Sequence, residues 1–254
     1  MRLMSTGAFH DHFSQVASRY ADFRPRYPAP LFDYLATLVS AESVVWDCAA
    51  GNGQASVDLA ERFAKIIATD ASKEQISAAS PHPTIEYRVA TAESSGLPDA
   101  SVNLVTVAQA VHWFDFERFY SEVMRVVQPA GYIALWAYGL NLVEDQEVNR
   151  LIYEYYSDTV GPYWPPERRL VEQGYRTIPF PFTQIAAPRF SIEALWSLDD
   201  LLGYFSTWSA TNRYIKEHGT NPIEQLREKL LPVWGPAEHT RKVSWPIAMR
   251  VGCL

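Results

Sequence analysis

The chain has 254 residues, of which 48% are hydrophobic and 20% are charged, and this balance excludes disordered and collagen-like chains. Its length suits one medium-sized domain that buries a substantial core. The formal net charge of −7 disfavours nonspecific attraction to phosphate backbones or to anionic lipid.

The sequence carries no pattern typical of a targeting or membrane-spanning segment. Residues 1–10 contain no apolar run of signal-peptide length, and no stretch approaches the roughly 20 apolar residues of a membrane helix. Cys48 and Cys253 lack the spacing of metal ligands, so we interpret both as small hydrophobic residues. We therefore expect a cytoplasmic protein without a metal site and without a nucleic-acid or membrane partner.

The first half of the chain alternates between β-prone apolar runs and segments whose apolar residues have helical spacing. Residues 9–30 begin with a helical pattern that prolines interrupt, and residues 31–39 resume it as a short amphipathic helix. Strands separated by helices predict a parallel, doubly wound sheet. The β-prone runs cover residues 43–47, 66–70, 85–89, 102–108 and 132–137, and helical spacing covers residues 57–64, 73–79 and 116–127.

The second half is less regular. Between residues 139 and 180 the alternation stops, and the proline-rich run 161–166 favours an inserted lid. Beyond it we predict a strand at 184–196, helices at 198–206 and 222–231, and a last strand at 241–251 that returns to the sheet. The expected fold class is α/β: a Rossmann-like, doubly wound, mostly parallel seven-stranded sheet with an antiparallel last strand and an inserted helical lid.

A glycine-containing turn joins the first predicted strand to its helix. Its sequence is Asp47-Cys-Ala-Ala-Gly-Asn-Gly53. Such a turn directs backbone N–H groups and the positive end of a helix toward the carboxyl edge of the sheet, where open α/β sheets bind nucleotides. An ordinary left-handed turn explains two glycines equally well.

The second predicted strand ends on Asp70, which follows Gly51 by 70 − 51 = 19 residues. An acidic residue at about this spacing typically accepts hydrogen bonds from ribose hydroxyls. The alternative is a helix cap for residues 73–79, since Asp at a strand-to-helix junction is a common cap. We favour nucleotide binding over capping.

The acid before the loop separates two kinds of cofactor. Residues 51–56 come close to the GxGxxG pattern of NAD(P)-dependent oxidoreductases. A carboxylate at Asp47 suits a cofactor with an ammonium group and would repel a pyrophosphate. Neither Tyr175 nor Tyr214 is followed by Lys at the fourth position, as a Tyr-x-x-x-Lys motif requires.

These motifs together resemble the class I S-adenosylmethionine-dependent methyltransferases with a methyltransferase type 11 domain. The family's Asp/Glu-x-Gly-x-Gly-x-Gly motif has Ala49 in place of its first glycine here, while Asp70-Ala71, Ala92-Glu93 and residues 107–115 follow in family order. Residues 13–28, 161–167 and 207–210 are similar to the branch that includes trans-aconitate methyltransferase. The resemblance implies one domain of 1–254, with a helical cover (1–40), a cofactor core (41–138), a lid and acceptor region (139–180 and 198–236) and C-terminal strands (181–197 and 237–254).

The resemblance also implies a site. The cofactor would be S-adenosylmethionine, leaving as S-adenosylhomocysteine, and its expected contacts are Tyr20, Arg24, Asp47, Ala49, Gly51, Gly53, Asp70, Ala71, Ala92, Glu93 and Gln109. The expected reaction is methyl transfer to a small-molecule acceptor, such as O-methylation of a carboxylic acid. We expect the protein to be a monomer or a homodimer.

Candidate acceptor groups follow from position and chemistry. His112, just past the fourth strand, is the candidate catalytic base, with a structural histidine as the alternative. Arginines bind carboxylates bidentately, and aromatic faces attract a sulfonium. The substrate-site candidates are therefore Arg26, Trp113, Tyr138, Trp164, Trp208 and Arg213. The alternatives are surface charges and core aromatics, and for the whole chain a non-catalytic cofactor-binding protein or an NAD(P)-dependent oxidoreductase.

Overall fold

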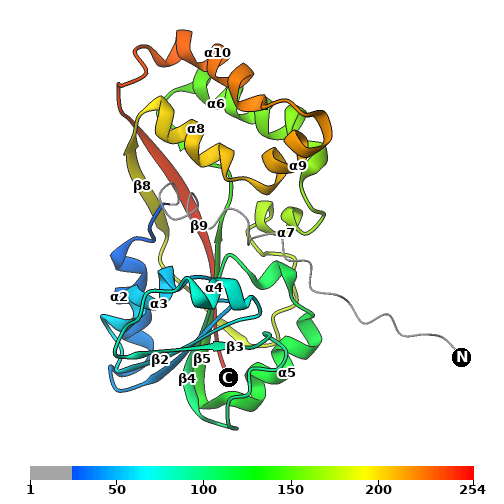
Figure 1. The fold of residues 1–254 in the computed structure, drawn as a ribbon. Helices are drawn as coiled ribbons and strands as arrows, with labels where there is room; N and C mark the ends of the chain where they lie inside the picture. The colour runs from blue at the N-terminus through cyan, green and yellow to red at the C-terminus, as the bar shows by residue number, and fades with distance from the viewer. Residues whose placement is uncertain (1–24) are drawn as a thin grey trace, which may run out of the picture.

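A computed structural model describes residues 25–254 of the chain as alternating strands and helices with a helical cap (Figure 1). The strands are β1 (Val44–Cys48), β2 (Lys65–Asp70), β3 (Ile85–Val89), β4 (Val102–Ala108), β5 (Val127–Tyr138), β6 (Leu142–Val143), β7 (Thr183–Ile185), β8 (Phe190–Trp196) and β9 (Arg241–Cys253). The α-helices are α2 (Ala29–Leu38), α3 (Gln54–Ala60), α4 (Lys73–Ser77), α5 (Phe116–Val126), α6 (Gln146–Glu154), α7 (Arg168–Glu172), α8 (Leu198–Ser206), α9 (Ser209–His218) and α10 (Pro222–Trp234). Short 3-10 turns occur at η1 (Val111–Trp113) and η3 (Gly161–Tyr163), and a π turn at η2 (Tyr155–Thr159).

The sheet follows the order β3-β2-β1-β4-β5-β9. β1 pairs in parallel with both β2 and β4, so the chain reverses its direction of winding between β1 and β4. Open α/β sheets bind ligands at the carboxyl ends of the strands that flank such a point. The expected α/β class, with a mostly parallel sheet and an antiparallel last strand, is confirmed.

The long strand β9 connects the sheet to the cap, which consists of helices α6, α8, α9 and α10 (Figure 1). Its second half pairs antiparallel with β5, and its first half pairs with β8. Val243 pairs with Val143 on one side and with Ala194 on the other, so β6 and β8 lie on opposite edges of β9. The sheet has nine strands rather than seven. The first half of β9 extends past β5 and pairs with β6 and β8, while β7 pairs with the last residues of β9.

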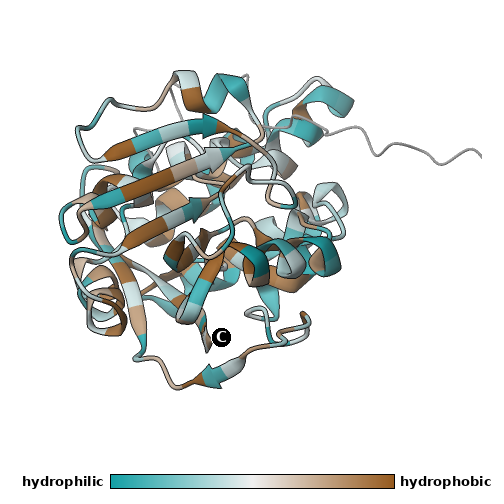
Figure 2. Cartoon of the chain, turned by 90° about the horizontal axis from the view of Figure 1, so that it is seen from below, coloured by the Kyte–Doolittle hydropathy of each residue, from teal (hydrophilic) through white to brown (hydrophobic). Residues whose placement is uncertain are grey.

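The sheet separates two hydrophobic clusters. One cluster joins α2 and α3 to the cap and includes Leu31 and Trp136, whereas the other lies under α5 and includes Trp46 and Phe119. Hydrophobic residues dominate the central strands in Figure 2, while the surrounding helices also carry hydrophilic residues. The two buried faces explain why β1 and β4 consist of nearly continuous apolar runs.

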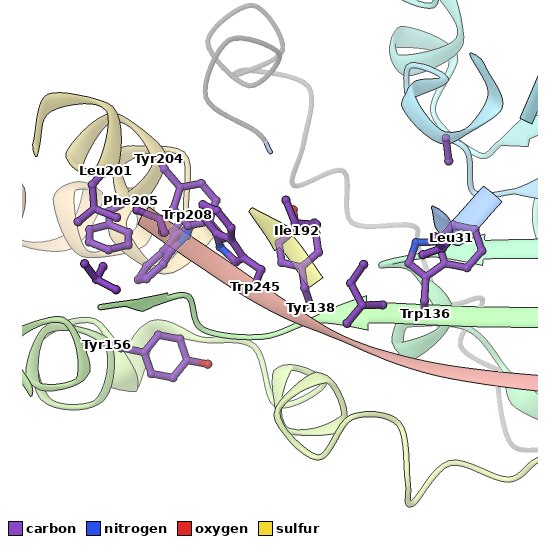
Figure 3. Packing of buried hydrophobic residues seen from close by; sticks show 14 of the residues in the cluster. Leu31, Trp136, Tyr138, Tyr156, Ile192, Leu201, Tyr204, Phe205, Trp208 and Trp245 are labelled. Carbon is purple, nitrogen blue, oxygen red and sulfur yellow. The ribbon is translucent and has the colours of Figure 1, made fainter. Parts of the chain in front are cut away.

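Aromatic side chains hold the cap together. Phe205 and Trp208 pack with ring centroids 4.5 Å apart, and Tyr155 stacks on Phe205 at 5.9 Å. Figure 3 shows Tyr204, Phe205, Trp208 and Trp245 gathered on the cap side of the same cluster that contains Trp136. The cap and the sheet therefore share one continuous core.

Three details of the second half differ from expectation. The predicted strand at 184–196 is two strands, β7 and β8, with Pro188 in the gap between them. The region 139–180 contains the regular helix α6, and helix α9 was not predicted at all. Within residues 25–254, no helix is long and apolar enough to cross a bilayer.

Candidate functional site

The loop between β1 and α3 forms a tight cradle at the carboxyl edge of the sheet. Gly51 and Gly53 have φ angles of +58° and +87°, in the left-handed region that favours glycine. The N–H of Ala50 donates to the carbonyl of Thr69 at 2.9 Å, which ties the loop to β2. A Cβ at Gly53 would lie 2.5 Å from the Tyr87 hydroxyl, so the close approach of β3 also requires glycine there.

Ala49 adopts the same left-handed conformation, with φ +55°. The resemblance places a glycine at this position, and the backbone angle explains why. An L-residue with a Cβ is strained in this region by about 1–2 kcal/mol. The substitution therefore preserves the shape of the loop at an energetic cost.

Asp47 lies beneath the loop and is fully buried. Its carboxylate accepts hydrogen bonds from Ser56 at 2.6 Å and from Thr106 at 2.9 Å. Burial raises the pKa of Asp47 to about 6, although the two hydrogen bonds lower it. In this arrangement Asp47 braces β1 against α3 and β4, and its contact with a cofactor ammonium group stays a prediction.

Asp70 ends β2 and organises the same cradle. One carboxylate oxygen accepts the N–H of Gly51 at 2.8 Å, and the other accepts the N–H of Ser72 at 2.8 Å. The cap of α4 is the Ser72 side chain, which accepts from Gln75, so Asp70 does not itself cap this helix. Ala71 follows Asp70 at the rim of the loop and is partly exposed.

The segment after β3 lies beside the start of α5. Ala92 is buried, and Glu93 accepts a hydrogen bond from the backbone N–H of Asp115 at 3.1 Å. This contact connects the carboxyl end of β3 to the segment that follows β4. Ala92 and Glu93, two of the predicted cofactor contacts, therefore lie at the same edge of the sheet as the loop.

Gln109, directly after β4, offers an acceptor to a ligand. Its backbone is left-handed, with φ +56°, and its side-chain amide donates to the carbonyl of Tyr138 at 3.0 Å. Its Oε1 is buried and has no partner among the described residues. An orphaned acceptor fits a cofactor with an ammonium group, because it supplies an oxygen that the fold leaves unsatisfied.

His112 lies in η1, past the end of β4. Its Nδ1 is 2.8 Å from the Tyr175 hydroxyl, and the Tyr175 ring is fully buried. Burial and, to a smaller extent, the positive charge of Arg168 together lower the pKa of His112 to about 3. The side chain is therefore neutral near pH 7.

A cavity of about 760 Å³ lies next to the carboxyl end of β5. Aromatic rings, two prolines and two arginines surround it. Its lining residues are Gly139, Leu140, Tyr153, Tyr156, Ser157, Gly161, Trp164, Pro165, Pro166, Arg168, Arg169 and Glu172. The volume falls within the range of small-molecule sites.

The predicted acceptor residues separate into different environments. Trp164 lines the cavity, and Trp208 supports it from behind with ring centroids 5.4 Å apart. Tyr138 is buried at the end of β5, whereas 40% of Trp113 is exposed beside His112. Arg213 donates to the carbonyl of Tyr163 at 3.2 Å.

Arg26 is exposed, and its charge acts on Asp58 of α3. It does not line the cavity, and its predicted place at the acceptor site stays a prediction. The proposed contacts of Tyr20 and Arg24 lie outside the described residues.

Four residues at the site were missed from sequence. Tyr87 packs on Gly53, Tyr175 holds His112, and Tyr156 and Arg168 line the cavity. All four lie outside the motifs, and only the proline-rich run 161–166 marked the region of the cavity. Among residues 25–254, no group of three or more His, Cys, Asp or Glu side chains is arranged to hold a metal ion.

Comparisons with known proteins agree with this geometry. The family described as a methyltransferase domain matches residues 46–135. A "putative methyltransferase" of Dictyostelium discoideum is 33% identical over 247 residues, which cover 95% of this chain and 94% of that protein. An "uncharacterized methyltransferase" of Schizosaccharomyces pombe is 28% identical and covers 92% of this chain and 93% of its own length.

One solved structure is similar over nearly the whole chain. It is that of a "putative type II methyltransferase" from Anaeromyxobacter dehalogenans, with a TM-score of 0.85 and 44% identity over 91% of this chain and 98% of that one. The fold and the loop define the class of S-adenosylmethionine-dependent methyltransferases. The chain belongs to this family, and S-adenosylmethionine is its cofactor. The NAD(P)-dependent alternative is therefore wrong.

Proposed function

We propose that this enzyme methylates a small-molecule acceptor, and that the reaction is the O-methylation of a carboxylic acid. The observation that carries the proposal is the aromatic cavity of about 760 Å³ beside the carboxyl end of β5. The net charge of −7 disfavours a nucleic-acid substrate. We also propose that the protein has no membrane partner and is a monomer or a homodimer.

We assign the cofactor to the edge formed by the ends of β1 to β4. The proposed contacts within the described residues are Asp47, Ala49, Gly51, Gly53, Asp70, Ala71, Ala92, Glu93 and Gln109. The left-handed turn at Gly51 and Gly53 and the unsatisfied Oε1 of Gln109 support this assignment. Bound S-adenosylmethionine supplies a methyl group on a sulfonium that a nucleophile displaces in line.

The low pKa of His112 favours an acceptor that is already ionised. A carboxylate is charged at neutral pH and needs no general base, so the protein contributes alignment and exclusion of water. A phenol or an amine would need His112 to take a proton, and a pKa of about 3 makes the imidazole a weak base. We therefore propose that His112 is a positioning residue, whose hydrogen bond with the Tyr175 hydroxyl holds the two side chains in place at the site.

The test is methyl transfer from labelled S-adenosylmethionine to a panel of small carboxylic acids, phenols and amines. We expect turnover with at least one acid and none with DNA or RNA. Activity on phenols or amines alone would refute the acid proposal and return His112 to the role of base. Cofactor binding without turnover of any compound would instead support a non-catalytic binding protein.

A further inference from the structure

Arg168, the first residue of α7, is held in a fixed orientation beside the cavity. Its guanidinium carbon lies 4.8 Å from the centre of the Trp164 ring and 5.7 Å from that of Tyr156. Its Nε donates to the Tyr156 hydroxyl at 3.0 Å. Contacts with two aromatic faces and one hydrogen bond restrict the plane of the guanidinium.

The rest of the guanidinium remains available for a ligand. Within residues 25–254, neither Nη group of Arg168 donates a hydrogen bond, and no carboxylate lies within ion-pair distance of it. Glu172 lines the same cavity, but its carboxylate accepts from the Tyr156 hydroxyl. A fixed guanidinium with two available Nη groups matches the geometry of a carboxylate.

The position of Arg168 connects the cavity to the site of methyl transfer. Its charge lowers the pKa of His112, which lies past the end of β4. Gly139 and Leu140, directly after β5, line the same cavity. Because β5 pairs with β4, the cavity lies beside the carboxyl edge at which the cofactor is assigned.

Two neighbouring tyrosines in the π turn η2 have different partners. In η2, Tyr155 bonds to Thr211 inside the cap, whereas Tyr156 faces Arg168 and Trp164. In Figure 3 Tyr156 lies beneath the aromatic cluster, with its hydroxyl directed away from its own helix. π turns occur frequently at functional sites.

We propose that Arg168 binds the carboxylate of the acceptor, while the rings of Tyr153 and Trp164 contact its apolar body. The inference rests on the proposed function. In the reaction, a carboxylate oxygen forms a bond to the methyl carbon as the carbon–sulfur bond breaks, and the bonding pair stays on sulfur. The ester is neutral and no proton moves, so the product loses its ionic attraction to Arg168 and is released.

The test is calorimetric binding of matched acids and amides to the full chain saturated with S-adenosylhomocysteine. The probes are benzoate, phenylacetate, cinnamate and hexanoate, each with its primary amide. We expect at least one acid to bind the unmodified protein more tightly than its amide. Arg168→Met should weaken the binding of that acid by roughly 10- to 100-fold and leave the binding of the amide unchanged, since hydrogen bonds to charged groups contribute this much energy.

Two variants provide controls. Arg176→Met removes the same charge from an exposed residue that does not line the cavity, and it should leave acid binding unchanged. Arg168→Lys keeps the charge but loses the planar fork, so it should recover only part of the affinity. Binding of S-adenosylhomocysteine to every variant reports a folded core.

Three results would overturn the assignment of Arg168. In the first, no acid of the panel binds to the unmodified protein. In the second, Arg168→Met loses affinity for the acid and for its amide to the same extent. In the third, the affinity of Arg168→Met for the acid is unchanged. Methyl transfer to a carboxylic acid would then still support the proposed function. Failure of the proposed function itself would appear as absence of turnover with every carboxylic acid.

Discussion

Ala49 occupies a backbone position that glycine adopts without strain. Its φ of +55° costs about 1–2 kcal/mol for a residue with a Cβ. We therefore expect Ala49→Gly to be neutral or to stabilise the protein by about 1 kcal/mol, despite the added freedom of the unfolded chain. Urea denaturation measures the difference.

Ala36→Gly is the matched control, because Ala36 lies inside helix α2 with ordinary helical geometry. It should destabilise the protein by about 1 kcal/mol. Equal losses in the two variants would show that the turn at Ala49 is not strained.

Asp70 should be the most sensitive single position for cofactor binding. Asp70→Ala removes the acceptor of the Gly51 and Ser72 N–H groups and, with it, the carboxylate that we assign to the ribose. We expect affinity for S-adenosylhomocysteine to fall more than about tenfold, given that bonds to charged groups contribute roughly 1.5–3 kcal/mol. The exposed Asp33→Ala variant should bind normally in the same titration. Normal binding by Asp70→Ala would contradict the assignment.

The pKa of His112 predicts the dependence of the rate on pH. Because burial and Arg168 hold this pKa at about 3, kcat for an acid acceptor should show no inflection near 6.5, the usual histidine value. Initial rates between about pH 5 and about pH 8 test this. An inflection near 6.5 that disappears in His112→Gln would identify His112 as a working base.

The same group affects stability in a defined direction. The unfolded chain protonates His112 below about 6.5, whereas the folded protein does so only below about 3. The contribution of this group is therefore complete above pH about 6.5 and falls as the pH falls toward 3. His112→Gln should lose this part of the acid sensitivity in urea titrations.

The residues of the cofactor loop were predictable because their chemistry depends on local sequence. Asp47, Gly51, Gly53 and Asp70 stand at fixed offsets from apolar runs, and one sheet edge collects them. Arg168 was not predictable, because its role depends on the rings of Tyr156 in η2 and Trp164 after η3, which only the folded chain brings beside it. Arg26, which precedes α2, is exposed, and its place at the acceptor site stays a prediction.

At the scale of elements, the cap depends on the packing of α8 and α9. Trp208 is buried against Tyr155, Phe205 and Trp164. Trp208→Ala should destabilise the protein by about 3–5 kcal/mol, as expected for a large buried ring. The highly exposed Leu195→Ala should change stability by less than about 0.5 kcal/mol. A small effect of Trp208→Ala in denaturant titrations would show a loosely packed cap.

The helices of the cap differ in how clearly their sequences predict them. Helix α6 has Asp145 as its cap and buries Val148, Leu151 and Ile152 at helical spacing, a signal that was present but unused. Helix α9 buries only Ala210 and Thr211, so its apolar period is weak. Its formation depends on packing against α8 and α10.

At the scale of the whole molecule, the shared core predicts cooperative unfolding. Trp136 of the sheet and Trp208 of the cap belong to the same hydrophobic cluster. Denaturation followed by tryptophan fluorescence and by far-ultraviolet circular dichroism should therefore give coincident transitions. Two separated transitions would show that the cap unfolds independently. The assignment of 139–180 and 198–236 to a separate lid and acceptor region remains a proposal.

The pairing of β9 has a consequence for how the protein acquires its structure during synthesis. Residues 241–253 lie between β5 and β6 on one edge and β7 and β8 on the other. Until the ribosome has released these residues, the edge of β5 exposes unpaired backbone groups, and such edges recruit strands from other chains. Nascent chains stalled before residue 241 should consequently be good clients for chaperones that shield strand edges.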